Sequence, residues 1–186
     1  MDEKRIFIGS LIKTKSLEDV FNKLKDRLSK KTNIKWSRTP ENFHVTYKFI
    51  GNLPLDKIKE IQKYIEKNYA RPINIDLEIT GINYFTKKGK PAVLYAEVKE
   101  KNGEILNKIH RQIEDYLYEI GVISKKEKTF VPHITLGRIK SVSPEFYDII
   151  NEFRQIKMGQ IDSLKVQIIE SELSPKGALY KPLKID

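Results

Sequence analysis

Hydrophobic and polar positions along the chain predict a mixture of strands and helices. Strands are expected where a short run is rich in β-branched and aromatic residues, or where every second position is apolar. Such runs cover residues 5–12, 34–37, 43–50, 73–79, 82–85, 92–98, 130–139, 161–169 and 178–183. Helices are expected where apolar residues recur three and four positions apart. These stretches cover residues 16–28, 56–68, 104–120 and 143–153.

The order of these elements predicts the fold class. Strands and helices are interspersed without strict alternation, and several short loops join one strand directly to the next. This order favours an α+β fold with largely antiparallel sheets over a doubly wound parallel sheet. No stretch is long enough to serve as a linker, so residues 1–186 are expected to form a single domain.

Residues typical of helix ends flank three of the expected helices. Ser16 and Ser143 are placed to cap helix N-termini, and Pro144 would occupy the first helical position after Ser143. Gly121 suits the position that follows the helix over 104–120. The turn at 174–177 and the basic turn at 87–90 are expected to join strands.

The strand over 43–50 shows the clearest alternation. In an ideal strand, successive side chains point to opposite faces. Four apolar residues would therefore share one face and three polar residues the other, namely Phe43, Val45, Tyr47 and Phe49 against His44, Thr46 and Lys48. On this pattern Phe49 belongs to the core with Val45.

Composition narrows the function classes. The 186 residues are 39% hydrophobic and 32% charged, which suits a globular domain with a real core. The chain has no cysteine, which excludes disulfides, zinc ribbons, iron–sulfur clusters and thiol nucleophiles. There is no apolar run of about 18 residues to span a membrane, and the first apolar run is too short for a signal peptide. The protein is therefore expected to be cytoplasmic.

The net charge of +10 favours a polyanionic partner, nucleic acid above all. A lysine-rich composition can also arise from genome composition or growth temperature, so charge alone leaves this open. Lys87, Lys88 and Lys90 are expected to form a solvated turn, with a nucleic-acid contact as the alternative.

Two of the three histidines occur in a repeated motif. His44-Val45-Thr46 and His133-Ile134-Thr135 lie about half the chain apart, each with a β-branched apolar residue between His and Thr. In each copy His and Thr point the same way, and the apolar residue points into a core. If the two halves pack as pseudo-symmetric lobes, the two motifs can meet across a cleft.

Two imidazoles and two hydroxyls suit acid–base chemistry on a phosphoester. One imidazole takes a proton from the attacking oxygen, and the other gives a proton to the leaving oxygen. Thr46 and Thr135 would donate hydrogen bonds to the phosphate oxygens. An ideal strand turns Arg138 away from His133, but a bulge at Gly137 would bring its guanidinium back to bind phosphate.

Metal chemistry is not favoured by the pattern. A zinc site would need further ligands beside the two motif histidines. His110 lies on an expected helix without an H-x-x-x-H pattern and is expected to be a surface or half-buried residue. We therefore expect no metal and no cofactor.

At the level of whole motifs, the chain resembles the 2H phosphoesterases, and among them the bacterial and archaeal RNA 2′,3′-cyclic phosphodiesterases, historically called 2′-5′ RNA ligases. Four blocks in order carry the resemblance, at residues 5–9, 36–51, 130–138 and 171–180. The second block has one inserted position before its glutamate, Glu41. The third contains the F-x-P-H-[IV]-T-[LI]-[AG]-R pattern.

The resemblance implies a bilobal, pseudo-symmetric α+β fold with two antiparallel sheets lining a central cleft and helices outside. It implies metal-independent hydrolysis of RNA 2′,3′-cyclic phosphate ends to 2′-phosphomonoesters. Some family members also join tRNA halves through a 2′-5′ linkage.

The resemblance also assigns roles to individual residues. His44 and His133 are implied as the catalytic acid–base pair. We assign His133 as base to water and His44 as acid to O3′, and the sequence leaves the reverse assignment open. Thr46, Thr135 and Arg138 would bind the phosphate, and Phe49 is the candidate nucleotide contact. The expected partner is RNA with a cyclic phosphate end, such as a tRNA fragment, and the expected state is a monomer.

Two other functions stay open at this point. One is a phosphodiesterase for a small cyclic nucleotide or ADP-ribose cyclic phosphate, and the other is a non-catalytic RNA-binding module. The high positive charge favours the longer polyanion. The intact motifs favour catalysis, since lysine and arginine would suffice for binding alone.

Overall fold

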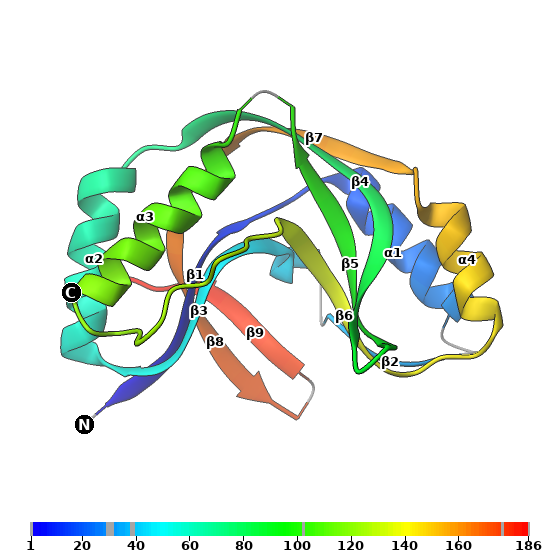
Figure 1. The fold of residues 1–186 in the computed structure, drawn as a ribbon, viewed down its shortest axis with the longest axis horizontal. Coiled ribbons are helices and arrows are strands. Elements are labelled where there is room, and N and C mark those ends of the chain that lie inside the picture. Colours follow the sequence, from blue (N-terminus) through cyan, green and yellow to red (C-terminus); the bar gives the residue numbers. More distant parts are fainter. Residues whose placement is uncertain (1, 29–31, 38–39, 102, 176, 186) are drawn as a thin grey trace.

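The computed structural model describes residues 2–28, 32–37, 40–101, 103–175 and 177–185. In these ranges the chain forms nine strands, four α-helices and one short 3-10 helix (Figure 1). The strands are β1 (Glu3–Leu11), β2 (Asn33–Trp36), β3 (His44–Pro54), β4 (Ile73–Lys87), β5 (Lys90–Glu100), β6 (His133–Ser141), β7 (Lys157–Leu164), β8 (Gln167–Ser174) and β9 (Gly177–Pro182). The helices are α1 (Lys15–Leu28), η1 (Pro40–Asn42), α2 (Leu55–Tyr69), α3 (Ile105–Glu119) and α4 (Glu145–Phe153).

The strands follow one antiparallel path in the order β7-β4-β5-β6-β3-β1-β8-β9, and β2 pairs with β6 beside this path. The connection between β6 and β3 consists of a single pair, Val45 with Ile134. Each half of the path therefore resembles a separate small sheet, and the two meet at this pair. The expected α+β class with antiparallel sheets is confirmed.

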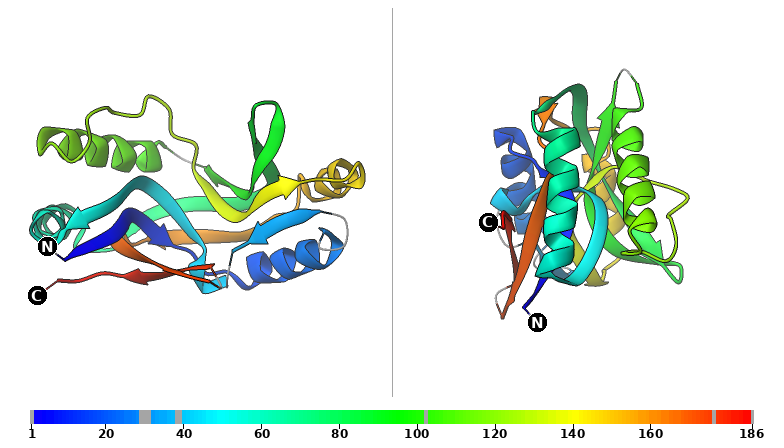
Figure 2. Two further views of the ribbon diagram at one scale, coloured as in Figure 1. Left: turned by 90° about the horizontal axis from the view of Figure 1, so that it is seen from below. Right: turned by 90° about the vertical axis from the view of Figure 1, so that its left-hand side faces the viewer.

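The helices lie outside the strands and cover the two halves in pairs (Figures 1 and 2). α1 and α4 contact the half that contains β4 and β7, whereas α2 and α3 contact the half that contains β3 and β8. Each helix turns an apolar stripe inward, as Leu17 and Leu24 of α1 and Ile58 and Ile61 of α2 illustrate, all of them fully buried. Among the described residues, no helix is long and apolar enough to cross a bilayer.

Two expected strand assignments were wrong. Residues 161–169 do not form one strand, because β7 ends at Leu164 and pairs with β4, while β8 starts at Gln167 and pairs with β1. The chain passes from one half of the path to the other at residues 165–166. In contrast, 73–79 and 82–85 form one strand, β4, because Gly81 is accommodated as a bulge with φ of 61°. A Cβ on Gly81 would collide with the carbonyl oxygen of Arg154.

The helix ends also differ from expectation. The hydroxyl of Thr14, not Ser16, accepts the backbone N–H of Leu17 at 3.1 Å and so caps α1. Ser143 uses its backbone carbonyl, not its hydroxyl, to accept the N–H of Phe146 at the start of α4. Gly121 follows α3 with φ of 70°, as expected for that position.

Candidate active site

The two His-x-Thr motifs begin the two strands that meet at the centre of the sheet path. His44 is the first residue of β3, and His133 is the first residue of β6. The Val45–Ile134 pair is antiparallel and both residues are fully buried. Antiparallel pairing brings each histidine toward the threonine of the other motif, and both His-x-Thr pairs then point to the face opposite the core.

A bulge follows each motif at the same place. On β6, Thr135 pairs with Tyr95 and Gly137 with Leu94, so Leu136 is the extra residue. On β3, Thr46 pairs with Gly9 and Lys48 with Ile8, so Tyr47 is the extra residue. An extra residue reverses the side-chain parity beyond it. Arg138 therefore shares a face with His133 and Thr135. The sequence required a bulge near Gly137 for Arg138 to face the site, and the structure has one at Leu136.

The bulge in β3 overturns the expected parity of Lys48 and Phe49. Phe49 does not join Val45 in the core, since it is 60% exposed and faces the same side as His44. Lys48 does not face the site, since it is 7% exposed and forms ion pairs behind the strand. The fifth residue after each motif histidine thus lies on the site face, and it is Phe49 in one motif and Arg138 in the other.

Both imidazoles are held by the same backbone contact. Nδ1 of His44 lies 2.5 Å from the carbonyl oxygen of Asn42, and Nδ1 of His133 lies 2.7 Å from the carbonyl oxygen of Val131. A carbonyl oxygen only accepts hydrogen bonds, so Nδ1 carries the proton in both rings. The neutral rings therefore keep a lone pair on Nε2, the atom that can take up and release a proton.

Aromatic rings surround each imidazole. Phe7 and Tyr180 lie 4.7 and 4.8 Å from the ring of His44, and Phe85 and Tyr95 lie 4.9 and 5.4 Å from the ring of His133, measured between centroids. These rings exclude water from the surroundings of the imidazoles. Burial of this kind disfavours the charged imidazolium and so lowers the pKa of a histidine.

The surroundings lower both histidine pKa values. Burial lowers the pKa of His44 to about 4 against the opposing hydrogen bond to Asn42, and the charge of nearby His133 lowers this pKa further. Burial also lowers the pKa of His133, although its hydrogen bond to the Val131 carbonyl opposes the shift. Without a bound anion, both rings are therefore neutral at neutral pH.

A pocket of about 320 Å³ opens beside His44, and residues from both halves of the chain line it. The lining includes His44, Phe49, Thr135 and Arg138. Thr46 and His133 are not part of this lining. The remaining lining residues are Arg5, Lys35, Trp36, Ser37, Asn42, Gly137, Ser171, Leu173, Gly177, Ala178 and Tyr180. This lining contains three cations and no carboxylate, so the pocket suits an anion.

Asn42 and Tyr180 also contribute to this site, although the sequence predicted no role for either residue. The Asn42 side chain donates to the carbonyl of Ala178 at 2.9 Å and accepts the N–H of Tyr180 at 3.4 Å. It therefore fastens β9 beside His44, while its own carbonyl orients that ring. Both residues belong to the sequence blocks that carried the family resemblance, but the blocks alone did not indicate these contacts.

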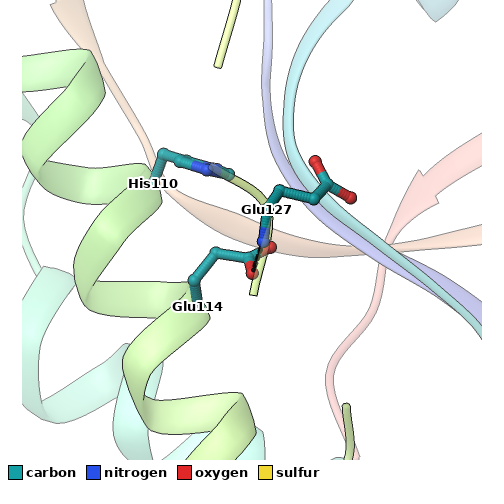
Figure 3. A group of neighbouring side chains, drawn as sticks. All are labelled: His110, Glu114 and Glu127. Carbon is teal, nitrogen blue, oxygen red and sulfur yellow. Dashed lines mark hydrogen bonds between the residues drawn. The ribbon is translucent and has the colours of Figure 1, made fainter. Parts of the chain in front are cut away.

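One group of side chains elsewhere has the composition of a metal site. Among the described residues, ligand atoms of His110, Glu114 and Glu127 lie within 4.8 Å of one another (Figure 3). The ammonium group of Lys48 already lies 2.6 Å from Glu114 and 2.7 Å from Glu127. His110 is only 3% exposed, so the expectation of a surface or half-buried residue was wrong.

Comparison with solved structures identifies the fold. TT0787 of Thermus thermophilus superposes with a TM-score of 0.76 at 20% identity, covering 97% of this chain and 95% of that one. LigT of Escherichia coli in its apo form superposes with a TM-score of 0.70 at 15% identity, covering 99% and 96%. Two pseudo-symmetric halves that bring paired His-x-Thr motifs together define a 2H phosphoesterase.

Sequence comparison assigns the chain to one family within this class. Residues 6–184 match the AKAP7 2′5′ RNA ligase-like domain, so the chain belongs to this family. It is 31% identical over 146 residues to an RNA 2′,3′-cyclic phosphodiesterase of Archaeoglobus fulgidus, covering 78% of this chain and 80% of that protein. It is 27% identical over 177 residues to one of Aquifex aeolicus, covering 95% and 93%.

Proposed function

We propose that this protein hydrolyses the 2′,3′-cyclic phosphate ends of RNA to 2′-phosphomonoesters, with His44 and His133 as the acid–base pair. The observation that carries the proposal is the pair of imidazoles, each with Nδ1 fixed by a backbone carbonyl and Nε2 left for proton transfer. The relatives named RNA 2′,3′-cyclic phosphodiesterase support the choice of substrate.

In the proposed reaction, Nε2 of His133 takes a proton from water as the water oxygen attacks phosphorus. The bond between phosphorus and O3′ breaks, and Nε2 of His44 gives its proton to O3′. The phosphate remains on O2′. Hydroxyls of Thr46 and Thr135 and the guanidinium of Arg138 donate hydrogen bonds to the nonbridging oxygens, where negative charge increases in the transition state.

Exposure supports His133 as the base. His133 is half-buried, whereas His44 is 7% exposed, so water from solvent reaches His133 more easily. His44 must carry a proton before the reaction, although its pKa is about 4 without substrate. A bound phosphodiester supplies the negative charge that favours the imidazolium.

The pocket supports an RNA end as the ligand. Phe49 is exposed in the pocket wall, where a base can stack on its ring. Arg5, Lys35 and Arg138 supply positive charge along the same wall. We propose tRNA fragments among the substrates and a cytoplasmic, monomeric protein. If a 5′-hydroxyl replaces water as the nucleophile, the same proton transfers join two RNA ends through a 2′-5′ linkage.

The test is incubation of an RNA oligonucleotide bearing a 2′,3′-cyclic phosphate in the presence of EDTA, with the product isomer identified by chromatography. We expect a 2′-phosphate, and we expect His44→Ala and His133→Ala to lower kcat by about 10²- to 10⁴-fold. Full activity in either variant, or a 3′-phosphate product, would contradict the proposal.

A sulfur substitution then separates the two roles. A cyclic substrate with sulfur in place of O3′ has a leaving group that departs without a proton. This substrate should restore activity to His44→Ala but not to His133→Ala. Restoration of His133→Ala alone would reverse the assignment of acid and base.

A further inference from the structure

The third histidine lies in a buried polar cluster behind the two motifs. Nδ1 of His110, on α3, donates to the carbonyl of Tyr47 at 2.9 Å. The His110 ring also stacks on Phe130, with centroids 4.5 Å apart and planes at 8°. Tyr47 is the bulge residue of the first motif, and Phe130 lies three residues before His133. One side chain therefore contacts the backbone of one motif and the approach to the other.

Glu114 makes a second connection one helical turn further along α3. One of its carboxylate oxygens lies 2.6 Å from Nζ of Lys48, the residue after the bulge in β3. The other accepts the backbone N–H of Glu127 at 2.8 Å, which Figure 3 shows as a dashed line. Lys48 also donates to the Glu127 carboxylate at 2.7 Å. The segment that leads to His133 is thus fastened to both α3 and β3.

The contact between Lys48 and Glu114 is made by two buried charges. The side chains of Lys48 and Glu114 are 8% and 3% exposed. Burial lowers the pKa of Lys48, but its bonds to Glu114 and Glu127 outweigh this effect and keep the ammonium charged. Removing one partner of a buried pair leaves the other charge uncompensated, so breaking the pair of Lys48 and Glu114 is expected to disturb the structure more than breaking a surface pair.

We propose that four residues, Lys48, His110, Glu114 and Glu127, form a clamp that joins α3 to β3 and to the segment before β6. This clamp sets the position of the two catalytic histidines relative to each other. Its four members act as positioning residues, since Lys48, His110 and Glu114 are buried behind the strand that carries His44 and none of the four lines the pocket. The proposal rests on the proposed function. Val131, whose carbonyl holds Nδ1 of His133, lies between the fastened Glu127 and His133. If that segment shifts, His133 loses the partner that fixes its tautomer.

The same cluster cannot serve as a metal site while Lys48 is in place. A divalent ion and the ammonium group would compete for the same carboxylate oxygens of Glu114 and Glu127. Lys48 already supplies the positive charge that these carboxylates need. The cluster is therefore an ion-pair network that joins three parts of the chain.

The experiment compares Lys48→Met and Glu127→Gln with a matched control, Lys126→Met. Lys126 pairs with Asp115 at 2.6 Å and so joins the same segment to the same helix, but on the surface. We expect Lys48→Met to lower kcat about 10- to 100-fold with little change in KM, because small misplacements of catalytic groups are costly. Glu127→Gln should lower kcat several-fold, and Lys126→Met should match the wild type. Equal kcat in all four proteins would overturn the clamp.

A spectroscopic measurement tests the clamp independently of turnover. Ring ¹⁵N chemical shifts report which nitrogen of His133 carries the proton. The wild type and Lys126→Met should show the Nδ1–H tautomer, and the clamp variants should show a mixture. Because the Glu127 side chain is 60% exposed, Glu127→Gln should fold even if Lys48→Met does not. An unchanged His133 tautomer in a folded clamp variant would overturn the proposal, even if the cyclic phosphate proved not to be the substrate.

Rescue and metal addition complete the test. His110→Asn retains a donor near the position of Nδ1 and should keep more activity than His110→Leu, which has none. Equal losses in these two variants would contradict the role given to the Tyr47 contact. A rise in the wild-type melting temperature with equimolar Zn²⁺, lost in Glu114→Gln, would assign the cluster to a metal and overturn the clamp.

Discussion

At the scale of single residues, the site depends on how two imidazoles are oriented and protonated. Each ring uses the carbonyl two residues earlier in the chain as its Nδ1 partner, Asn42 for His44 and Val131 for His133. A local contact of this kind needs no carboxylate to fix the tautomer. Burial is the largest cause of the lowered pKa of each ring, and the hydrogen bond to the carbonyl opposes it in both cases.

The lowered pKa values predict an acid-shifted pH profile for kcat/KM, which reports the free enzyme. The proposed reaction needs one neutral and one protonated imidazole. That form is most populated between the two pKa values, both of which lie below the ordinary 6.5. As pH rises above the higher pKa, the needed proton is lost, and kcat/KM should fall about tenfold per pH unit.

Steady-state rates on a cyclic-phosphate oligonucleotide between pH 4.5 and 8.5 would measure this profile. The limbs for kcat should lie at higher pH than those for kcat/KM, since bound phosphate favours the imidazolium. Circular dichroism at each pH serves as the control for unfolding. A kcat/KM that keeps rising from pH 6.5 to 8 would show that the free imidazoles are not depressed as described.

Much of the site at this scale could be predicted from the sequence. The paired histidines and threonines follow from the repeated motif, and Arg138 follows from its place beside Gly137. The hydrogen bond from the Asn42 side chain to the carbonyl of Ala178 could not be predicted, because the two residues lie far apart in the chain. The buried position of His110 was also missed, because a helix pattern gives no sign of what packs on a given polar residue.

At the scale of elements, the matching bulges decide which residues face the substrate. The alternation over 43–50 indicated a regular strand, and nothing in that pattern signals an extra residue at Tyr47. The expected orientations of Phe49 and Lys48 were therefore both wrong, and the bulge at Tyr47 is the cause of both errors. The break within 161–169 was missed for a related reason, since closely spaced apolar residues continue across positions that belong to the two halves of the sheet path.

The close approach of β1 and β3 predicts the effect of Gly9→Ala. Gly9 pairs with Thr46 at the bulge, and a Cβ there would lie 2.6 Å from the carbonyl oxygen of Val45. Relief of this contact requires the strands to separate beside the first motif. We expect a loss of about 1–3 kcal/mol in the free energy of unfolding, together with a fall in kcat, measured by urea denaturation and steady-state kinetics.

Gly121→Ala provides the control for Gly9→Ala. Gly121 lies after α3 with φ of 70°, and no atom lies within 4 Å of the position that a Cβ would take there. Alanine there should cost about 1–2 kcal/mol through backbone strain and leave kcat unchanged. If both variants lowered kcat equally at matched stability, the effect of Gly9→Ala would be due to stability alone and not to displacement of Thr46.

At the scale of the whole molecule, positive charge lies on both the pocket wall and the hairpin beside His133. Phe85 of β4 packs on His133, and the turn that follows carries Lys87, Lys88 and Lys90, all exposed. Figure 2 shows this hairpin standing away from the rest of the sheet. Within the described part of the chain these three lysines form no ion pair, so their charge is available to a nucleic-acid backbone.

This arrangement predicts that charge reversal on the hairpin affects long substrates selectively. Replacing Lys87, Lys88 and Lys90 by Glu should raise KM for an oligonucleotide and leave KM for a 2′,3′-cyclic mononucleotide unchanged. If each lysine neutralises one phosphate, the slope of log(kcat/KM) against log[salt] should become shallower by about 2. Kinetics at several salt concentrations would measure both effects.

A matched triple variant controls for the change in net charge. Lys59, Lys63 and Lys67 are exposed on α2, on the outside of the other half of the molecule (Figure 1). Their replacement by Glu alters the total charge equally but should leave the salt slope near that of the wild type. Equal effects of both triples would indicate general attraction by the whole molecule, with no path for RNA along the hairpin.

The difference between Phe49 and Arg138 has a consequence for the direction of the reaction. A two-fold arrangement of identical His-x-Thr pairs cannot by itself distinguish the two ester oxygens of a cyclic phosphate, since either ring could serve either oxygen. The matching bulges place a ring on one side and a guanidinium on the other. A nucleotide that stacks on Phe49 and directs its phosphate to Arg138 can enter in only one orientation. In the proposed reaction, the regiochemistry of ring opening is therefore determined by a pair of residues that take no part in proton transfer.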